Sequence, residues 1–94
     1  MNLEQEIRRL ELIKMELDAM IITFRMMKET DNKDIKNLLK SNTIRNINRL
    51  YELGIDYKLQ VECLELAKND DKNIFEIVSD ILCKCSNTKE DIFK

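Results

Sequence analysis

Apolar residues recur along the chain at spacings of three and four, the pattern of amphipathic helices. Regions with this pattern are separated by short polar breaks. The pattern predicts an all-α fold, a compact bundle of four to five helices in a single domain over residues 1–94. We expect a long N-terminal helix over about residues 2–29, then shorter helices over about 33–40, 42–53, 57–68 and 72–85.

The predicted first helix is apolar on two faces. One face is a heptad-like series that is interrupted at Lys14 and consists of Leu3, Ile7, Leu10, Leu17, Ile21 and Phe24. The second face consists of Leu12, Met15, Ala19, Ile22 and Met26. At about 100° per residue, the two faces lie nearly opposite each other. A monomer cannot carry such a helix on its surface without exposing one face, so this helix is expected to be central in the fold or shared with another chain.

The middle of the chain is predicted to contain a break. On one unbroken helix, the apolar residues of segment 33–40 and those of segment 42–53 would point in roughly opposite directions. We therefore predict a break or sharp kink at Ser41–Asn42, with one of these two residues capping the following helix.

Several helix ends can be predicted from single residues. Gly54 should end its helix in a left-handed conformation, with Ile55 folding back on that helix as in the Schellman motif. Asp56 should cap the next helix, and segment 69–71 should cap the last long one. A weak capping box predicts a final turn over residues 88–93.

The composition excludes the commonest catalytic chemistry. The chain has no histidine and one glycine, and that glycine is the predicted helix stop. The commonest general base and a glycine-rich phosphate loop are therefore missing. We expect no enzymatic activity, no cofactor and no small-molecule substrate.

The three cysteines do not predict a metal site. A structural zinc site needs four ligands, and two helical residues separated by one residue point about 200° apart, as Cys83 and Cys85 do. Cys63 and Cys85 are expected to be small buried residues and Cys83 to be more exposed. Free thiols, a charged amino terminus and the lack of a long apolar run favour a cytoplasmic protein without a membrane segment.

Segment 34–53 also suggests DNA binding. Residues 31–55 hold five basic and three acidic side chains and are the only net-basic third of the chain. Segment 34–53 resembles a helix-turn-helix, and segment 44–67 resembles the helix–Leu-Gly–helix unit of MerR-type regulators. These resemblances imply contacts to DNA bases and phosphates. The candidate residues are Lys36, Lys40, Arg45, Asn46 and Arg49.

Two functions are therefore expected from the sequence. The first is a small non-enzymatic protein-interaction module, a regulator or inhibitor of the type that phages or mobile elements encode, which forms a homodimer or binds a partner protein through an apolar helix. Frequent Ile, Lys and Asn suggest an AT-rich genome, which fits such an origin. The alternative is a dimeric DNA-binding regulator. The candidate protein interface consists of Leu10, Leu12, Met15, Leu17, Ala19, Ile21, Ile22, Phe24 and Met26.

Overall fold

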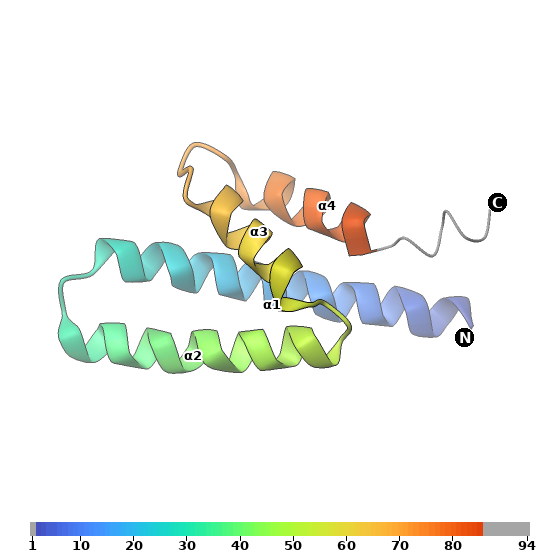
Figure 1. The fold of residues 1–94 in the computed structure, drawn as a ribbon, viewed down its shortest axis with the longest axis horizontal. Coiled ribbons are helices and arrows are strands. Elements are labelled where there is room, and N and C mark those ends of the chain that lie inside the picture. Colours follow the sequence, from blue (N-terminus) through green and yellow to red (C-terminus); the bar gives the residue numbers. More distant parts are fainter. Residues whose placement is uncertain (1, 86–94) are drawn as a thin grey trace.

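The computed structural model describes residues 2–85, which form four α-helices without a strand (Figure 1). The helices are α1 (Leu3–Glu29), α2 (Lys33–Glu52), α3 (Tyr57–Ala67) and α4 (Ile74–Cys85). The predicted all-α bundle with a long N-terminal helix is confirmed. The molecule measures 50 × 25 × 20 Å, and its long dimension follows α1 and α2.

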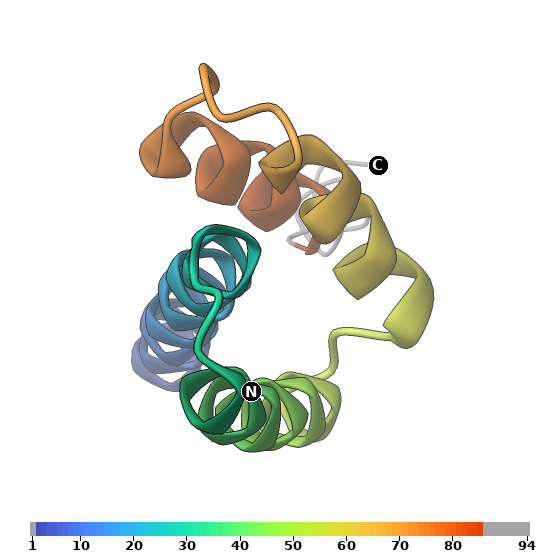
Figure 2. The same ribbon diagram turned by 90° about the vertical axis from the view of Figure 1, so that its left-hand side faces the viewer.

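α1 is the central element of the bundle. It runs antiparallel to α2, and it also contacts α3 and α4, which lie across its other side (Figures 1 and 2). Buried side chains from α1 meet those of the other three helices in one core. The core consists of Ile13, Leu17, Met20, Ile21, Leu50, Ile55, Cys63, Ala67, Ile77, Val78 and Ile81.

Polar side chains cap the starts of all four helices. In each case a side-chain oxygen accepts a hydrogen bond from a backbone N–H of the first turn, which the helix itself leaves unpaired. The capping residues are Asn2, Asn32, Asp56 and Asn73. The predicted cap of the last helix in segment 69–71 is wrong, because Asn73 caps this helix and segment 69–71 forms a preceding turn. The helix begins at Ile74, two residues after the predicted start at about residue 72. The predicted turn over 88–93 lies outside the described residues.

The predicted helix stop after α2 is confirmed. Gly54 has a φ of +100°, which favours glycine. Its N–H donates to the Tyr51 carbonyl at 3.0 Å, and the Ile55 N–H donates to the Leu50 carbonyl at 2.9 Å. These two bonds define the Schellman motif, and they bring Ile55 into the core.

The predicted break at Ser41–Asn42 is wrong, because residues 33–52 form one continuous helix. The prediction assumed that apolar residues on both sides of residue 41 had to face the core, but Leu38 and Ile44 are exposed. Polar residues complete the inward face instead, and the Thr43 hydroxyl donates to the Leu39 carbonyl at 2.9 Å. The inward face of α2 consists of Leu39, Thr43, Asn46, Ile47 and Leu50.

Candidate functional site

The second apolar face of α1 remains uncovered in the folded chain. We call Leu12, Met15, Ala19, Ile22 and Met26 the outer face of α1. Leu12, Met15, Ile22 and Met26 are 44, 65, 46 and 49 % exposed, and Ala19 between them is also exposed. In Figure 2, α4 lies above α1 and α2 below it, and no helix covers the left-hand side of α1. A row of large apolar side chains on an uncovered helix face is typical of a protein-binding surface.

The other predicted interface residues belong to the opposite, inner face of α1. Leu17 and Ile21 have no exposed surface, and Leu10 and Phe24 pack partly buried against the core. A partner that leaves the fold intact therefore cannot reach Leu17 or Ile21. The structure reduces the candidate interface to the outer face.

An apolar groove between α1 and α4 continues the outer face. Its volume is about 350 Å³. Lys14 and Asp18 form an ion pair of 3.9 Å at its wall, and Phe75 of α4 is 73 % exposed. The apolar lining consists of Ile22, Ile74, Phe75, Val78 and Leu82. Because Ile22 belongs to both surfaces, a partner on the outer face can also enter this groove.

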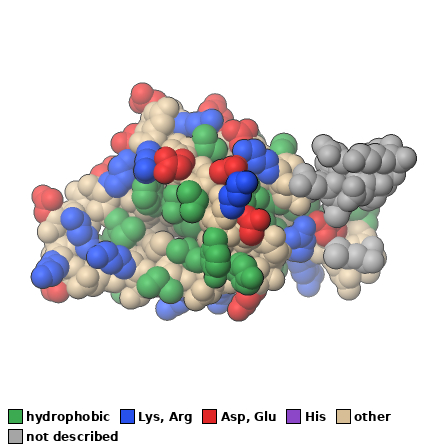
Figure 3. All heavy atoms as spheres, viewed as in Figure 1, with side chains coloured by type: hydrophobic (Ala, Val, Ile, Leu, Met, Phe, Trp, Pro, Cys, Tyr) green, Lys and Arg blue, Asp and Glu red, His purple; other side chains and the backbone are tan. Residues whose placement is uncertain are grey.

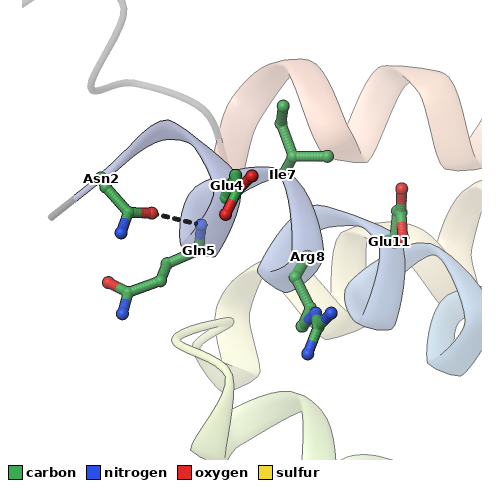
Figure 4. A pocket seen from close by; sticks show the side chains of 6 residues that line it. All are labelled: Asn2, Glu4, Gln5, Ile7, Arg8 and Glu11. Carbon is green, nitrogen blue, oxygen red and sulfur yellow. Dashed lines mark hydrogen bonds between the residues drawn. The ribbon is translucent and has the colours of Figure 1, made fainter.

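A hollow at the amino-terminal end of α1 offers no convergent chemistry. It is lined by Asn2, Glu4, Gln5, Ile7, Arg8 and Glu11 (Figure 4). All six residues come from the start of α1. The Asn2 side chain caps this helix, because its oxygen accepts a hydrogen bond of 2.8 Å from the Gln5 N–H. The side chains point in different directions around the helix, so they do not surround a ligand.

A second apolar surface lies on α2 and α3. Figure 3 faces these helices and shows apolar side chains near the centre of the molecule, between charged ones. Its exposed members include Ile44, Tyr51, Tyr57 and Val61. The rings of Tyr51 and Tyr57 stack on each other with centroids 4.9 Å apart, so each tyrosine already covers part of the other.

The predicted DNA-contacting residues do not form a helix-turn-helix. Residues 34–53 lack the turn of that motif, because α2 is continuous to Glu52. Asn46 is 9 % exposed and donates to Glu16 of α1 at 2.7 Å, and Arg49 pairs with the same carboxylate at 3.3 Å. Asn46 and Arg49 thus join α2 to α1. Among the candidates, Lys40 and Arg45 are exposed and Lys36 is half-buried, and DNA binding through them stays a prediction.

Arg25 holds α1 to the end of α3. Its guanidinium donates to the carbonyls of Ala67, Asn69 and Lys72 at 3.2, 3.0 and 2.7 Å. The Ala67 and Asn69 carbonyls lie at and just beyond the C-terminal end of α3, where the helix dipole places negative charge and intrahelical donors are missing. The Lys72 carbonyl lies in the turn that leads to α4. The spacing of residues in the sequence does not indicate this contact, because more than 40 residues separate the donor from its acceptors.

Arg9 makes the corresponding contact at the end of α2. It donates to the Leu53 carbonyl at 2.6 Å and forms an ion pair of 2.9 Å with Glu6. The hydrogen bond with Glu6 raises the pKa of Arg9 and lowers the pKa of Glu6. Arg9 and Arg25 together fix the direction of α1 relative to its neighbours, and so they hold the outer face in place.

The exposed carboxylates of α3 have cationic partners. Glu62 pairs with Lys84 of α4 at 2.8 Å, and Glu65 pairs with Lys68 at 2.9 Å. Within residues 2–85, no three Cys, Asp or Glu side chains are grouped so that they could hold a metal ion.

Burial suppresses ionisation of two cysteines. Cys63 is buried and Cys83 is exposed, as predicted, whereas Cys85 is only half-buried against the core. Burial, and then the neighbouring Cys85, raise the pKa of Cys63 from 9.0 to about 12. Burial raises the pKa of Cys85 to about 11, although Arg9 opposes this shift. Both thiols are therefore protonated at neutral pH and unreactive as nucleophiles.

Alkaline pH should consequently destabilise the protein. The folded state holds the Cys63 proton more tightly than the unfolded state, so the contribution of Cys63 to the free energy of unfolding is constant below pH 9.0 and falls as the pH rises towards about 12. At about pH 10.5, Cys63 alone should account for a loss of about 2 kcal/mol. Urea unfolding at neutral and alkaline pH measures this loss. Cys63→Ala should remove the Cys63 share of the pH dependence and leave that of Cys85, whereas Cys83→Ala should leave both; equal profiles for these two variants would contradict the assignment.

Comparisons with known proteins found no relative of this chain. A scan against protein-family models, a search of curated proteins and a search of solved structures each gave no match to this chain. Among the four helices of residues 2–85, none combines the length and apolar character needed to cross a membrane. The candidate site therefore depends on the geometry of α1 and its surroundings alone.

Proposed function

We propose that this chain is a small non-enzymatic protein-interaction module that binds another protein chain through the outer face of α1. The observation that carries the proposal is the exposure of this face after the fold has used the inner face for its core. An amphipathic helix that presents apolar residues at spacings of three and four is a common means of helix recognition. The fixed position of α1 favours binding, because a surface that is already ordered loses little entropy in a complex.

The biological role that fits this module is that of a regulator or inhibitor of the type that phages or mobile elements encode. Its small size and its lack of histidine and of a phosphate-binding loop support a role exerted by binding. The frequent Ile, Lys and Asn support the origin, and a cytoplasmic location agrees with its cysteine usage.

A retention experiment with matched variants tests the proposal. Tagged wild-type protein is incubated with extract of the cells that naturally produce it and with an untagged second copy, and retained chains are identified by mass spectrometry. Met15→Asp with Ile22→Asp should abolish retention, because a carboxylate buried without a partner opposes binding. The matched control, Ile44→Asp with Val61→Asp on α2 and α3, should retain the same chain as wild type.

The controls of this experiment make it decisive. Circular dichroism must show the same helical content and unfolding transition for both double variants, since all four positions are exposed. If wild type retains neither another protein nor a second copy, or if the α1 variant retains its partner as well as the control does, the proposed function is wrong.

A further inference from the structure

We propose that the partner of the outer face is a second copy of this chain, bound antiparallel to the first with Ala19 on the two-fold axis. This inference rests on the proposed function and names its partner. It follows from the spacing, the charges and the groove of α1, each of which fits a copy of itself.

The outer face is part of a longer regular series. Arg8 precedes it by one step and Glu29 follows it by one step, so that spacings of four and three alternate through seven positions: Arg8, Leu12, Met15, Ala19, Ile22, Met26 and Glu29. All seven residues are exposed. This alternation is the heptad pattern by which one helix packs along another, here on the face that the fold does not use.

The series is complementary to itself about Ala19. Leu12 and Met26 are each seven residues from Ala19, so a two-fold axis at Ala19 places Leu12 opposite Met26 of the second copy. Met15 lies four residues before Ala19, and Ile22 lies three residues after it. Met15 of one copy therefore faces Ile22 of the other, with an offset of one residue. Alanine at the crossing point lets the two backbones approach closely, because helix separation is set by the side chains at the contact.

The charges at the two ends select the antiparallel orientation. The side chains of Arg8 and Glu29 have no hydrogen bond or ion pair with other residues of the described segment 2–85. They lie eleven and ten residues from Ala19, so the antiparallel arrangement brings Arg8 of each copy beside Glu29 of the other. A parallel arrangement would instead place Arg8 beside Arg8 and Glu29 beside Glu29, which is repulsive.

The groove between α1 and α4 provides a place for Met15 of the second copy. Ile22 forms part of the groove wall, and the antiparallel register places Met15 of the second copy opposite Ile22. Met15 is 65 % exposed, and its flexible side chain adapts to irregular apolar spaces. By symmetry, each copy inserts one methionine and receives one, which is the property of an isologous interface.

Sedimentation equilibrium of the purified chain measures the association. We expect a mass of twice 11.2 kDa at micromolar concentration. Met15→Asp should raise the dissociation constant about 100-fold or more, because it buries an unpaired carboxylate. Arg8→Glu should weaken the dimer, and adding Glu29→Arg to it should restore the dimer, because the exchanged charges again face opposite signs. A mass of 11.2 kDa at all concentrations would overturn the inference.

Disulfide trapping measures the register. In a Cys83→Ser background, Ala19→Cys should crosslink two copies under mild oxidation, because cysteines bridge only when their Cα atoms lie within about 7 Å. Leu12→Cys should not crosslink, because the antiparallel arrangement separates the two positions by about 20 Å along the helices. Crosslinking of Leu12→Cys as readily as of Ala19→Cys, or a dimer in which neither variant crosslinks, would overturn the proposed arrangement. Both positions are exposed, and circular dichroism verifies that the variants fold.

The outcome also separates this inference from the proposed function. A chain that is monomeric when pure, but that retains another protein in a manner sensitive to Met15→Asp with Ile22→Asp, would end the self-association proposal and leave the interaction module in place. A chain that is monomeric and retains nothing would end both.

Discussion

Leu17→Ala is expected to lower the free energy of unfolding by about 3–4 kcal/mol. Leu17 has no exposed surface and lies in the core with Met20 and Ile21, so its truncation removes buried apolar contacts and leaves a cavity. The loss reports tertiary packing, because alanine is the better helix former of the two residues. Urea unfolding followed by far-UV circular dichroism measures it.

Leu12→Ala is the matched control on the same helix. Leu12 is 44 % exposed on the outer face, so the same substitution should cost at most about 1 kcal/mol in dilute, monomeric protein. The difference between the two variants distinguishes the two faces of α1. Equal losses would mean that the monomer uses the outer face as core, contrary to the structure.

Arg25→Met is expected to lower the free energy of unfolding by about 2–3 kcal/mol. The substitution keeps most of the apolar stem but removes three hydrogen bonds to carbonyls at the end of α3 and in the following turn. The hydrogen bonds to the Ala67 and Lys72 carbonyls are partly buried, and an unpaired acceptor is costly there. Urea unfolding measures the loss, and hydrogen exchange should show faster opening of α3.

Arg45→Met provides the control for this second prediction. Arg45 is exposed on α2 and has no ion pair with another residue of segment 2–85, so the same chemical change should cost no more than about 0.5 kcal/mol. A loss for Arg25→Met no larger than that for Arg45→Met would show that the contact with α3 does not stabilise the fold.

The local signals in the sequence were sufficient for most of the fold. The two apolar faces of α1 and the stop at Gly54 follow from spacing and from single residues with strong conformational preferences. The predicted break in α2 is wrong because the apolar pattern alone does not distinguish buried apolar residues from exposed ones. Ile44 is exposed, and the inward position at residue 46 is taken by an asparagine that binds Glu16. The spacing of apolar residues does not reveal a polar side chain that is buried together with a hydrogen-bonding partner.

Only part of the candidate site could be predicted, because the sequence alone does not show which apolar residues the fold buries. The sequence showed that α1 has more apolar surface than one small fold can cover, but not which of its faces the fold would use. That choice depends on how α2, α3 and α4 pack around α1. It depends also on contacts such as those of Arg9 and Arg25, which join residues more than 40 positions apart. Such contacts leave no periodic trace in a single sequence.

Methionine oxidation tests most directly whether a second copy covers the outer face of α1. Met15 and Met26 lie on that face and are exposed, whereas Met20 is fully buried and serves as the internal reference. Brief treatment with peroxide is followed by mass spectrometry of each methionine at low and at high protein concentration. We predict that Met15 and Met26 oxidise several times more slowly in concentrated than in dilute protein, while Met20 stays slow in both. Equal oxidation of Met15 and Met26 at the two concentrations would show that the outer face remains open, and would contradict the proposed dimer.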